Sequence, residues 1–129
     1  MSASELNAAS RKCEKLGLDR ADRMLLMCMD RKTAKCASGK EMLESWKYLK
    51  KRLKSLGLEG RGGIVRIKMG CVGICKGGPI MAVTPDGTWY GRCTPEAIEE
   101  IIQEHLINGR VVEKLVIAQN PDWARRHPV

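Results

Sequence analysis

The residues best suited to site chemistry are cysteines, of which the chain has six, four of them in two pairs. Cys28 and Cys36 have seven residues between them, whereas Cys71 and Cys75 have three. Four thiolates match the ligand set of a structural zinc ion or of an iron–sulfur cluster. Zinc sites usually take pairs separated by roughly two to four residues, so the wide first spacing favours a two-iron cluster. A zinc site, a thiol–disulfide site and inert cysteines remain open as alternatives.

Glycines surround the second pair of cysteines, at Gly70, Gly73, Gly77 and Gly78. Because glycine has no Cβ, the backbone there can approach a sulfur closely and donate N–H groups to it. This pattern suits a cluster whose sulfurs accept hydrogen bonds from the surrounding loop.

Two apolar runs, residues 24–28 and 64–69, predict strands that end at the two cysteine pairs. Between the runs, apolar residues at helical spacing predict a helix that begins at Glu41 and ends at Gly57. Two strands joined by a helical crossover should be parallel and the crossover right-handed. Both strands then end at one edge of the sheet, where neighbouring strands lie about 4.8 Å apart. We therefore expect the four thiols to converge there from two loops.

The second half of the chain predicts a hairpin and a helix. Strands over 80–84 and 88–93 flank a turn at Asp86-Gly87, and Thr94 and Pro95 begin a helix that ends at Asn108-Gly109. Residues 111–117 are expected to form an edge strand or a packed segment. The sequence thus predicts an α/β fold with a central mixed sheet of about four strands flanked by helices.

Three regions are expected along the chain. Residues 1–22 are predicted to be an N-terminal arm, helical around residues 5–16, residues 23–117 the folded domain, and residues 118–129 a C-terminal tail. The total of 129 residues fits one domain. The apolar runs are far shorter than the roughly 20 residues that cross a bilayer, and the first residues lack the apolar core of a secretory signal. We expect a cytoplasmic protein without membrane insertion.

Two segments carry a resemblance to a known family: CMDRKTAKC at residues 28–36 and GCVGICKGGPIMAVTPDGTWYGRCTPEAIEEIIQEHLINGRVV at residues 70–112. They contain a C-x3-C-x-x-GP loop, a hairpin with a Trp-Tyr pair, and a Pro-Glu helix ending near His-Leu. Over about residues 24–115 the chain resembles the thioredoxin-like 2Fe-2S ferredoxin family.

The resemblance implies a thioredoxin-like fold and one 2Fe-2S cluster per chain, with Cys28, Cys36, Cys71 and Cys75 as its ligands. It also implies a one-electron carrier rather than an enzyme, redox partner proteins, and commonly a homodimer. A related subunit of respiratory NADH dehydrogenases has a closer first cysteine pair and a longer helical arm, so a free-standing ferredoxin is favoured. The alternatives are a cluster-bearing subunit or sensor module of a larger redox complex, and a basic nucleic-acid-binding domain. No groove-reading motif supports nucleic-acid binding.

The net charge of +8 affects solubility and association rather than the fold, and it suits an acidic redox partner or a polyanion. Exposed lysines are expected on one face of the helix after Cys36, either as a solvated surface or as a docking patch that flanks the cysteine edge. They are Lys47, Lys50, Lys51 and Lys54.

The remaining candidates have mainly structural interpretations. Cys93 is expected to be a small buried hydrophobe, Cys13 a spare thiol in the arm, Trp46 a core residue, and His105 a capping or packing residue. Trp89 and Tyr90 alternate along a strand, so one should face inward and the other could contact a partner. Pro79 is expected to follow a cis peptide bond.

Overall fold

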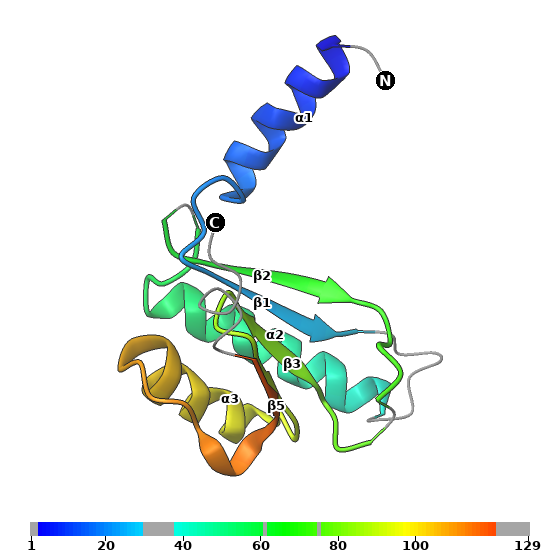
Figure 1. Ribbon diagram of the computed structural model, residues 1–129, viewed down its shortest axis with the longest axis vertical. Coiled ribbons are helices and arrows are strands. Elements are labelled where there is room, and N and C mark those ends of the chain that lie inside the picture. Colours follow the sequence, from blue (N-terminus) through cyan, green and yellow to red (C-terminus); the bar gives the residue numbers. More distant parts are fainter. Residues whose placement is uncertain (1–2, 30–37, 61, 75, 121–129) are drawn as a thin grey trace.

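The computed structural model describes residues 3–29, 38–60, 62–74 and 76–120. Helix α1 (Ala3–Leu16) comes first and projects away from the rest of the molecule (Figure 1). None of its residues is buried. It ends at Gly17, which has a φ of 80° that favours glycine. The arm is therefore helical, as the sequence predicts. No described helix is long and apolar enough to cross a membrane.

The next three elements form the predicted strand–helix–strand unit. Strand β1 (Arg23–Cys28), helix α2 (Gly39–Ser55) and strand β2 (Ile64–Met69) follow one another, and the two strands pair in parallel. Helix α2 begins two residues before the predicted Glu41, because the side chain of Ser38 accepts the Glu41 N–H and the Glu41 carboxylate accepts the Ser38 N–H. The parallel pairing aligns Cys28 with Met69, so both strands end at one edge of the sheet.

The remaining elements complete a five-stranded sheet in the order β2-β1-β3-β4-β5. They are β3 (Met81–Thr84), β4 (Thr88–Tyr90), α3 (Pro95–Ile101) with a π-helical turn (Ile102–Ile107), a 3-10 turn (Glu113–Leu115) and β5 (Val116–Gln119). The pairs after β1–β2 are antiparallel, so the sheet is mixed, as predicted. The fifth strand is β5, which pairs with β4 as the outermost strand of the sheet. It ends at Gln119, two residues beyond the segment 111–117 that was expected to form an edge strand or a packed segment.

Helices α2 and α3 cover the same face of the sheet and meet each other there (Figure 1). Leu25, Met27 and Val83 of the strands pack into one core with helical side chains such as Leu49 and Ile98. Polar groups also join the two helices at their rim. Nε and Nη2 of Arg52 donate to the carboxylate of Glu99, at 2.6 and 3.1 Å, and these bonds are the main reason that the pKa of Glu99 is lowered to about 2. The sheet is therefore fixed against both helices from one side.

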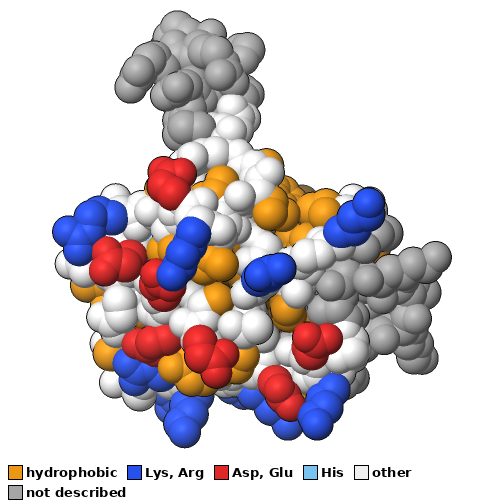
Figure 2. Space-filling model, turned by 90° about the horizontal axis from the view of Figure 1, so that it is seen from below, with side chains coloured by type: hydrophobic (Ala, Val, Ile, Leu, Met, Phe, Trp, Pro, Cys, Tyr) orange, Lys and Arg blue, Asp and Glu red, His pale blue; other side chains and the backbone are white. Residues whose placement is uncertain are grey.

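The opposite face of the sheet carries an apolar row that crosses all five strands. Because side chains alternate along a strand, the positions between the core residues point to this side. Their pairing gives the order Ile67, Leu26, Ala82, Trp89, Ala118. Among the residues that the structure describes, neither α2 nor α3 covers this row. On another side of the molecule, acidic and basic side chains are interspersed with small hydrophobic areas, so the net charge of +8 is not concentrated there (Figure 2).

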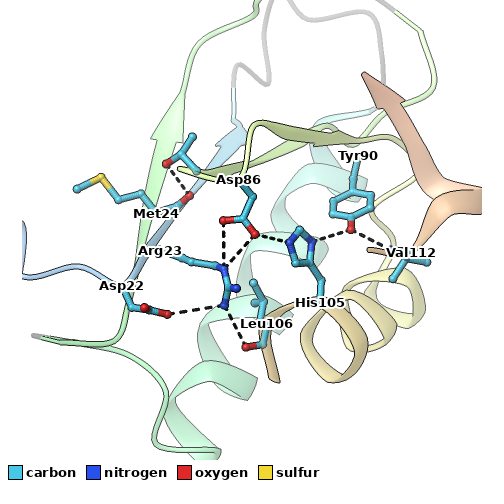
Figure 3. A network of polar contacts seen from close by, with 9 residues as sticks. Asp22, Arg23, Met24, Asp86, Tyr90, His105, Leu106 and Val112 are labelled. Atoms are coloured by element: carbon cyan, nitrogen blue, oxygen red, sulfur yellow. Dashed lines mark hydrogen bonds and ion pairs between the residues drawn. The ribbon is translucent and has the colours of Figure 1, made fainter. Parts of the chain in front are cut away.

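A buried polar network ties the hairpin to the first strand and to the last helix (Figure 3). The imidazole of His105 is 2% exposed, with Nε2 at 2.6 Å from Asp86 Oδ2 and Nδ1 at 2.7 Å from the Tyr90 hydroxyl. Arg23 donates from Nε to the Asp86 carboxylate and from Nη1 to the Leu106 carbonyl oxygen. The network thereby fastens β1, the hairpin turn, β4 and the end of the helix to one another.

One placement of the protons satisfies this network completely. The Val112 N–H donates to the Tyr90 hydroxyl oxygen at 3.1 Å, which leaves the hydroxyl proton for Nδ1 of His105. The imidazole then carries its own proton on Nε2 and donates it to Asp86. His105 is thus a packing residue, as predicted, and its hydrogen bonds determine which groups it packs against.

Removal of the Tyr90 hydroxyl should destabilise the fold more than removal of the hydroxyl from the other tyrosine, Tyr48. Tyr90→Phe leaves His105 Nδ1 and the Val112 N–H buried without a partner, and each such loss costs about 1–3 kcal/mol. Tyr48→Phe removes one bond to Glu99, which keeps Arg52 and Gln103 as partners. Its loss should stay below about 1.5 kcal/mol. Urea unfolding of both variants measures the difference, and equal losses would contradict this account of the network.

Candidate metal centre

Cys28 is the last residue of β1 and lies at the cysteine edge of the sheet. It is 1% exposed and packs with Met42 of α2 and with Ile80. Its N–H donates to the Ile80 carbonyl oxygen at 3.0 Å, and the next N–H, of Met29, donates to the Met69 carbonyl oxygen at 2.9 Å. The parallel pairing thus continues one residue past the strands and fixes the backbone on which the Cys28 thiol is carried.

Cys71 lies two residues past the end of β2, at the same edge, and is exposed. The N–H of Gly73 donates to the Cys71 sulfur at 3.4 Å. Gly73 has a φ of 88°, in the region that favours glycine, so this residue type allows the turn that aims the N–H at the sulfur. Donors of this kind stabilise negative charge on sulfur and tune the potential of sulfur-ligated metals.

The structure thus brings Cys28 and Cys71 to one edge, as the order of the elements predicts. Cys36 and Cys75, the other two predicted ligands, lie outside the described residues. Within the described ranges no three or more His, Cys, Asp or Glu side chains are gathered that could hold a metal ion. Cys13 lies in α1, which leads into the opposite end of β1 (Figure 1).

Backbone hydrogen bonds hold the segment after the second cysteine pair against the end of the hairpin. The N–H of Arg92 donates to the Gly77 carbonyl oxygen at 2.6 Å, and the N–H of Cys93 donates to the Pro79 carbonyl oxygen at 2.9 Å. The approach at Gly91 is close enough that an added Cβ would lie 2.8 Å from the Gly77 carbonyl oxygen. The Gly78-Pro79 peptide is cis, as predicted. The Thr84-Pro85 peptide is also cis, which was not among the features predicted from the sequence.

Trp89 is the outward-facing member of the Trp-Tyr pair, since Tyr90 is fully buried. It lines a hollow of about 380 Å³ that adjoins the loop after Cys71. The other lining residues are Val72, Ile74, Ile117 and Ala118. The predicted alternation of the two aromatic residues is therefore confirmed, and the outer one is part of an apolar surface beside a candidate ligand.

The basic face of α2, formed by Lys47, Lys50, Lys51 and Lys54, does not lie beside the cysteine edge. All four lysines are exposed, as predicted. However, α2 begins at the cysteine edge and runs back along the sheet (Figure 1). At about 1.5 Å per residue, Lys47 lies about 12 Å and Lys54 about 22 Å along the axis from Gly39. The prediction that these charges flank the cysteine edge is therefore wrong, because the helix carries them away from it. Trp46 packs against the core, as expected, beneath Arg66 and Lys68.

Known proteins resemble this chain in sequence and in fold. It is 52% identical over 48 residues to a 2Fe-2S ferredoxin of Clostridium pasteurianum, covering 37% of this chain and 47% of that one. It is 48% identical over 50 residues to a 2Fe-2S ferredoxin of Aquifex aeolicus, covering 39% of this chain and 45% of that one. The matches thus span about half the length of these curated relatives. No protein-family profile matches the chain.

The solved structure of a thioredoxin-like 2Fe-2S ferredoxin from Aquifex aeolicus superposes with a TM-score of 0.66 at 27% identity. The match covers 77% of this chain and 94% of that one. The chain resembles the thioredoxin-like 2Fe-2S ferredoxins. Its α/β fold is therefore thioredoxin-like, as the sequence predicts, and the two described candidate ligands lie at one edge of that fold.

Cys93 is not among the four predicted ligands, and its surroundings explain its role. It is fully buried beneath the hairpin, with its sulfur at 3.7 Å from the carbonyl oxygens of Tyr90 and Gly91. Burial raises the pKa of the Cys93 thiol to about 12, so the thiol is protonated at neutral pH. The interpretation of Cys93 as a small buried hydrophobe is confirmed.

Cys93 should therefore resist alkylation until the protein unfolds. With iodoacetamide at a pH near 8.5, Cys13 should react at the rate of a free thiol, because α1 leaves it partly exposed. Cys93 should react only as fast as the native state opens, and should match Cys13 in urea. Peptide mass spectrometry over a time course measures both rates. Equal reactivity of the two thiols in the native protein would contradict the burial of Cys93.

Proposed function

We propose that this chain is an electron carrier that binds a single 2Fe-2S cluster through Cys28, Cys36, Cys71 and Cys75 and passes electrons between redox partners. The main support is that Cys28 ends β1 and Cys71 follows the end of the parallel strand β2 by two residues, at one edge of a thioredoxin-like fold. The curated relatives, which are 2Fe-2S ferredoxins, add to that support. Such a carrier makes and breaks no bond in a substrate, so the proposal includes no catalytic residue.

The described residues fit such a group. Thiolates are the ligands that iron–sulfur clusters take, and both described candidate thiols are free of disulfides. The Gly73 N–H already donates to the Cys71 sulfur, the contact that a negatively charged sulfur ligand requires. The cluster, when bound, supplies a one-electron couple.

The two described ligands would have different roles. Cys28 is buried against Met42 and Ile80, where water is excluded and the backbone is held by strand pairing. Cys71 is exposed on a glycine-rich loop, where a partner protein can come close. We infer that Cys28 anchors the centre to the core and that the Cys71 loop presents it to redox partners.

The proposal extends to assembly and location. Ile67 and Leu26, partly exposed on the face of the sheet away from the helices, support a homodimer in which a second copy covers the β2 and β1 side of that face. The free thiols among the described residues support a cytoplasmic location, where thiols stay reduced. The net charge of +8 supports acidic redox partners.

The purified protein should be reddish brown, with about two iron and two acid-labile sulfide per chain. Replacing Cys28, Cys36, Cys71 or Cys75 by Ala should abolish or severely weaken the visible absorption, since each change removes one ligand. Iron and sulfide analysis together with the visible spectrum measures both results.

Cys13→Ala and Cys93→Ala are the matched controls, and both should keep the native spectrum. A colourless protein with stoichiometric zinc after anaerobic purification would contradict the proposal. So would a normal spectrum from Cys36→Ala.

A further inference from the structure

We propose that the hollow lined by Val72, Ile74, Trp89, Ile117 and Ala118 is the surface on which a redox partner docks. We further propose that this partner is an acidic protein that presents an apolar contact ringed by carboxylates. The inference rests on the proposed function, because it assigns an exit surface to the electron carried at the cysteine edge.

The first observation is where exposed apolar side chains gather. Six large hydrophobic side chains are exposed among the described residues, and three of them line this hollow. Val72 is 47% exposed, Ile74 39% and Ile117 46%. Contiguous exposed apolar surface marks interaction sites more often than scattered residues do. Two of the remaining three, Leu6 and Leu16, lie on α1, away from the hollow.

The second observation is the position of the hollow beside a candidate ligand. Val72 follows Cys71 directly, and the Gly73 N–H that donates to the Cys71 sulfur lies between Val72 and Ile74. Trp89 and Ala118 supply the opposite wall from paired positions on β4 and β5. A protein seated in the hollow therefore contacts the same loop that carries Cys71.

The third observation is the charge around the hollow. Lys76 and Arg92 are exposed, and the hydrogen bond from the Arg92 N–H to the Gly77 carbonyl places their backbones close together. From residue 60 to residue 95 the sequence has one acidic residue, Asp86, and its carboxylate is engaged by Arg23 and His105. The side of the hollow formed by the loop of Lys76 and Arg92 is thus basic with no free carboxylate from this stretch, which complements carboxylates on a partner.

The same charges argue against a second copy of this chain in the hollow. A symmetric pair would bring the same patch of both copies together, so the cations Lys76 and Arg92 of both copies would share one interface without facing carboxylates from the stretch between residues 60 and 95 other than the engaged Asp86. The patch is also small, since a stable interface uses about 20–30 residues on each side. Weak electron-transfer encounters are the class of complex that small interfaces serve.

The test uses ferric cytochrome b5, a small acidic haem protein, as oxidant of the dithionite-reduced protein in stopped flow. Ile117→Glu introduces a carboxylate into the hollow, while Ile107→Glu makes the same change at a site that is 47% exposed and outside it. Ile117→Glu should lower the second-order rate about tenfold, and Ile107→Glu should change it less than about twofold.

Charge reversal tests the rim separately. Lys76→Glu should slow the reaction at low salt and flatten its salt dependence, whereas Lys54→Glu, far along α2, should do so much less. Calorimetric titration of the oxidised protein with ferric cytochrome b5 measures binding without electron transfer and should weaken in the same two variants, Ile117→Glu and Lys76→Glu. The visible spectrum and the reduction potential of each variant confirm an intact centre.

The outcomes separate the two proposals. Wild-type protein without iron and sulfide would overturn the proposed function. Intact centres with equal rates and equal affinities for Ile117→Glu and Ile107→Glu would overturn the docking surface and leave the proposed function standing. A change of sedimentation from dimer to monomer in Ile117→Glu would also overturn it, because the occupant of the hollow would then be a second copy.

Discussion

The parallel pairing of β1 with β2 is the constraint on which the site depends. Parallel neighbours need a long crossover, and α2 supplies it along one face of the sheet. The pairing aligns Cys28 with Met69, so the chain leaves both strands at one edge with a cysteine at or just beyond the end of each. An antiparallel arrangement of the same two segments would place Cys28 and Cys71 at opposite edges. The chemistry proposed here thus follows from strand direction before any side-chain contact is considered.

The second half of the molecule is joined to the first by the pairing of β3 with β1, and Asp86 adds a polar connection at the hairpin turn. This residue forms the hairpin turn with Gly87 and also accepts hydrogen bonds from Arg23 at the start of β1 and from His105 in the last helical turn. The network lies at the end of β1 opposite to Cys28. The fold is therefore closed by polar contacts at one edge, while the cysteine edge keeps its loops and its exposed thiol.

The sequence predicts the elements whose signals are local. Apolar runs, the Asp86-Gly87 turn and the Thr94 cap locate β1, β2, the hairpin and α3, and the crossover rule places Cys28 beside the end of β2. The network of Asp86, His105 and Tyr90 carries no such signal, because its members lie 15 and 19 residues apart and meet only after the sheet has formed. The sequence leaves residues 111–117 as either an edge strand or a packed segment, and pairing with β4 decides that the strand is Val116–Gln119. The position of the lysine face was predicted incorrectly because only the start of α2 was considered. The length of the helix places its lysines away from the cysteines.

The contrast between two basic surfaces explains how a chain of net charge +8 could still dock selectively. The lysines of α2 form a long, exposed face with little apolar surface between them, so they attract an acidic protein without fixing its orientation. Screening limits such attraction to about 8 Å at physiological ionic strength, which is shorter than the distance from Lys54 to the start of the helix. Lys76 and Arg92 instead border apolar side chains next to Cys71, where charge can align a partner and desolvated contact can hold it. In the proposed docking mode, general attraction by the lysines of α2 and alignment at the hollow are thus separate tasks on separate surfaces, and only the hollow adjoins the loop that carries Cys71.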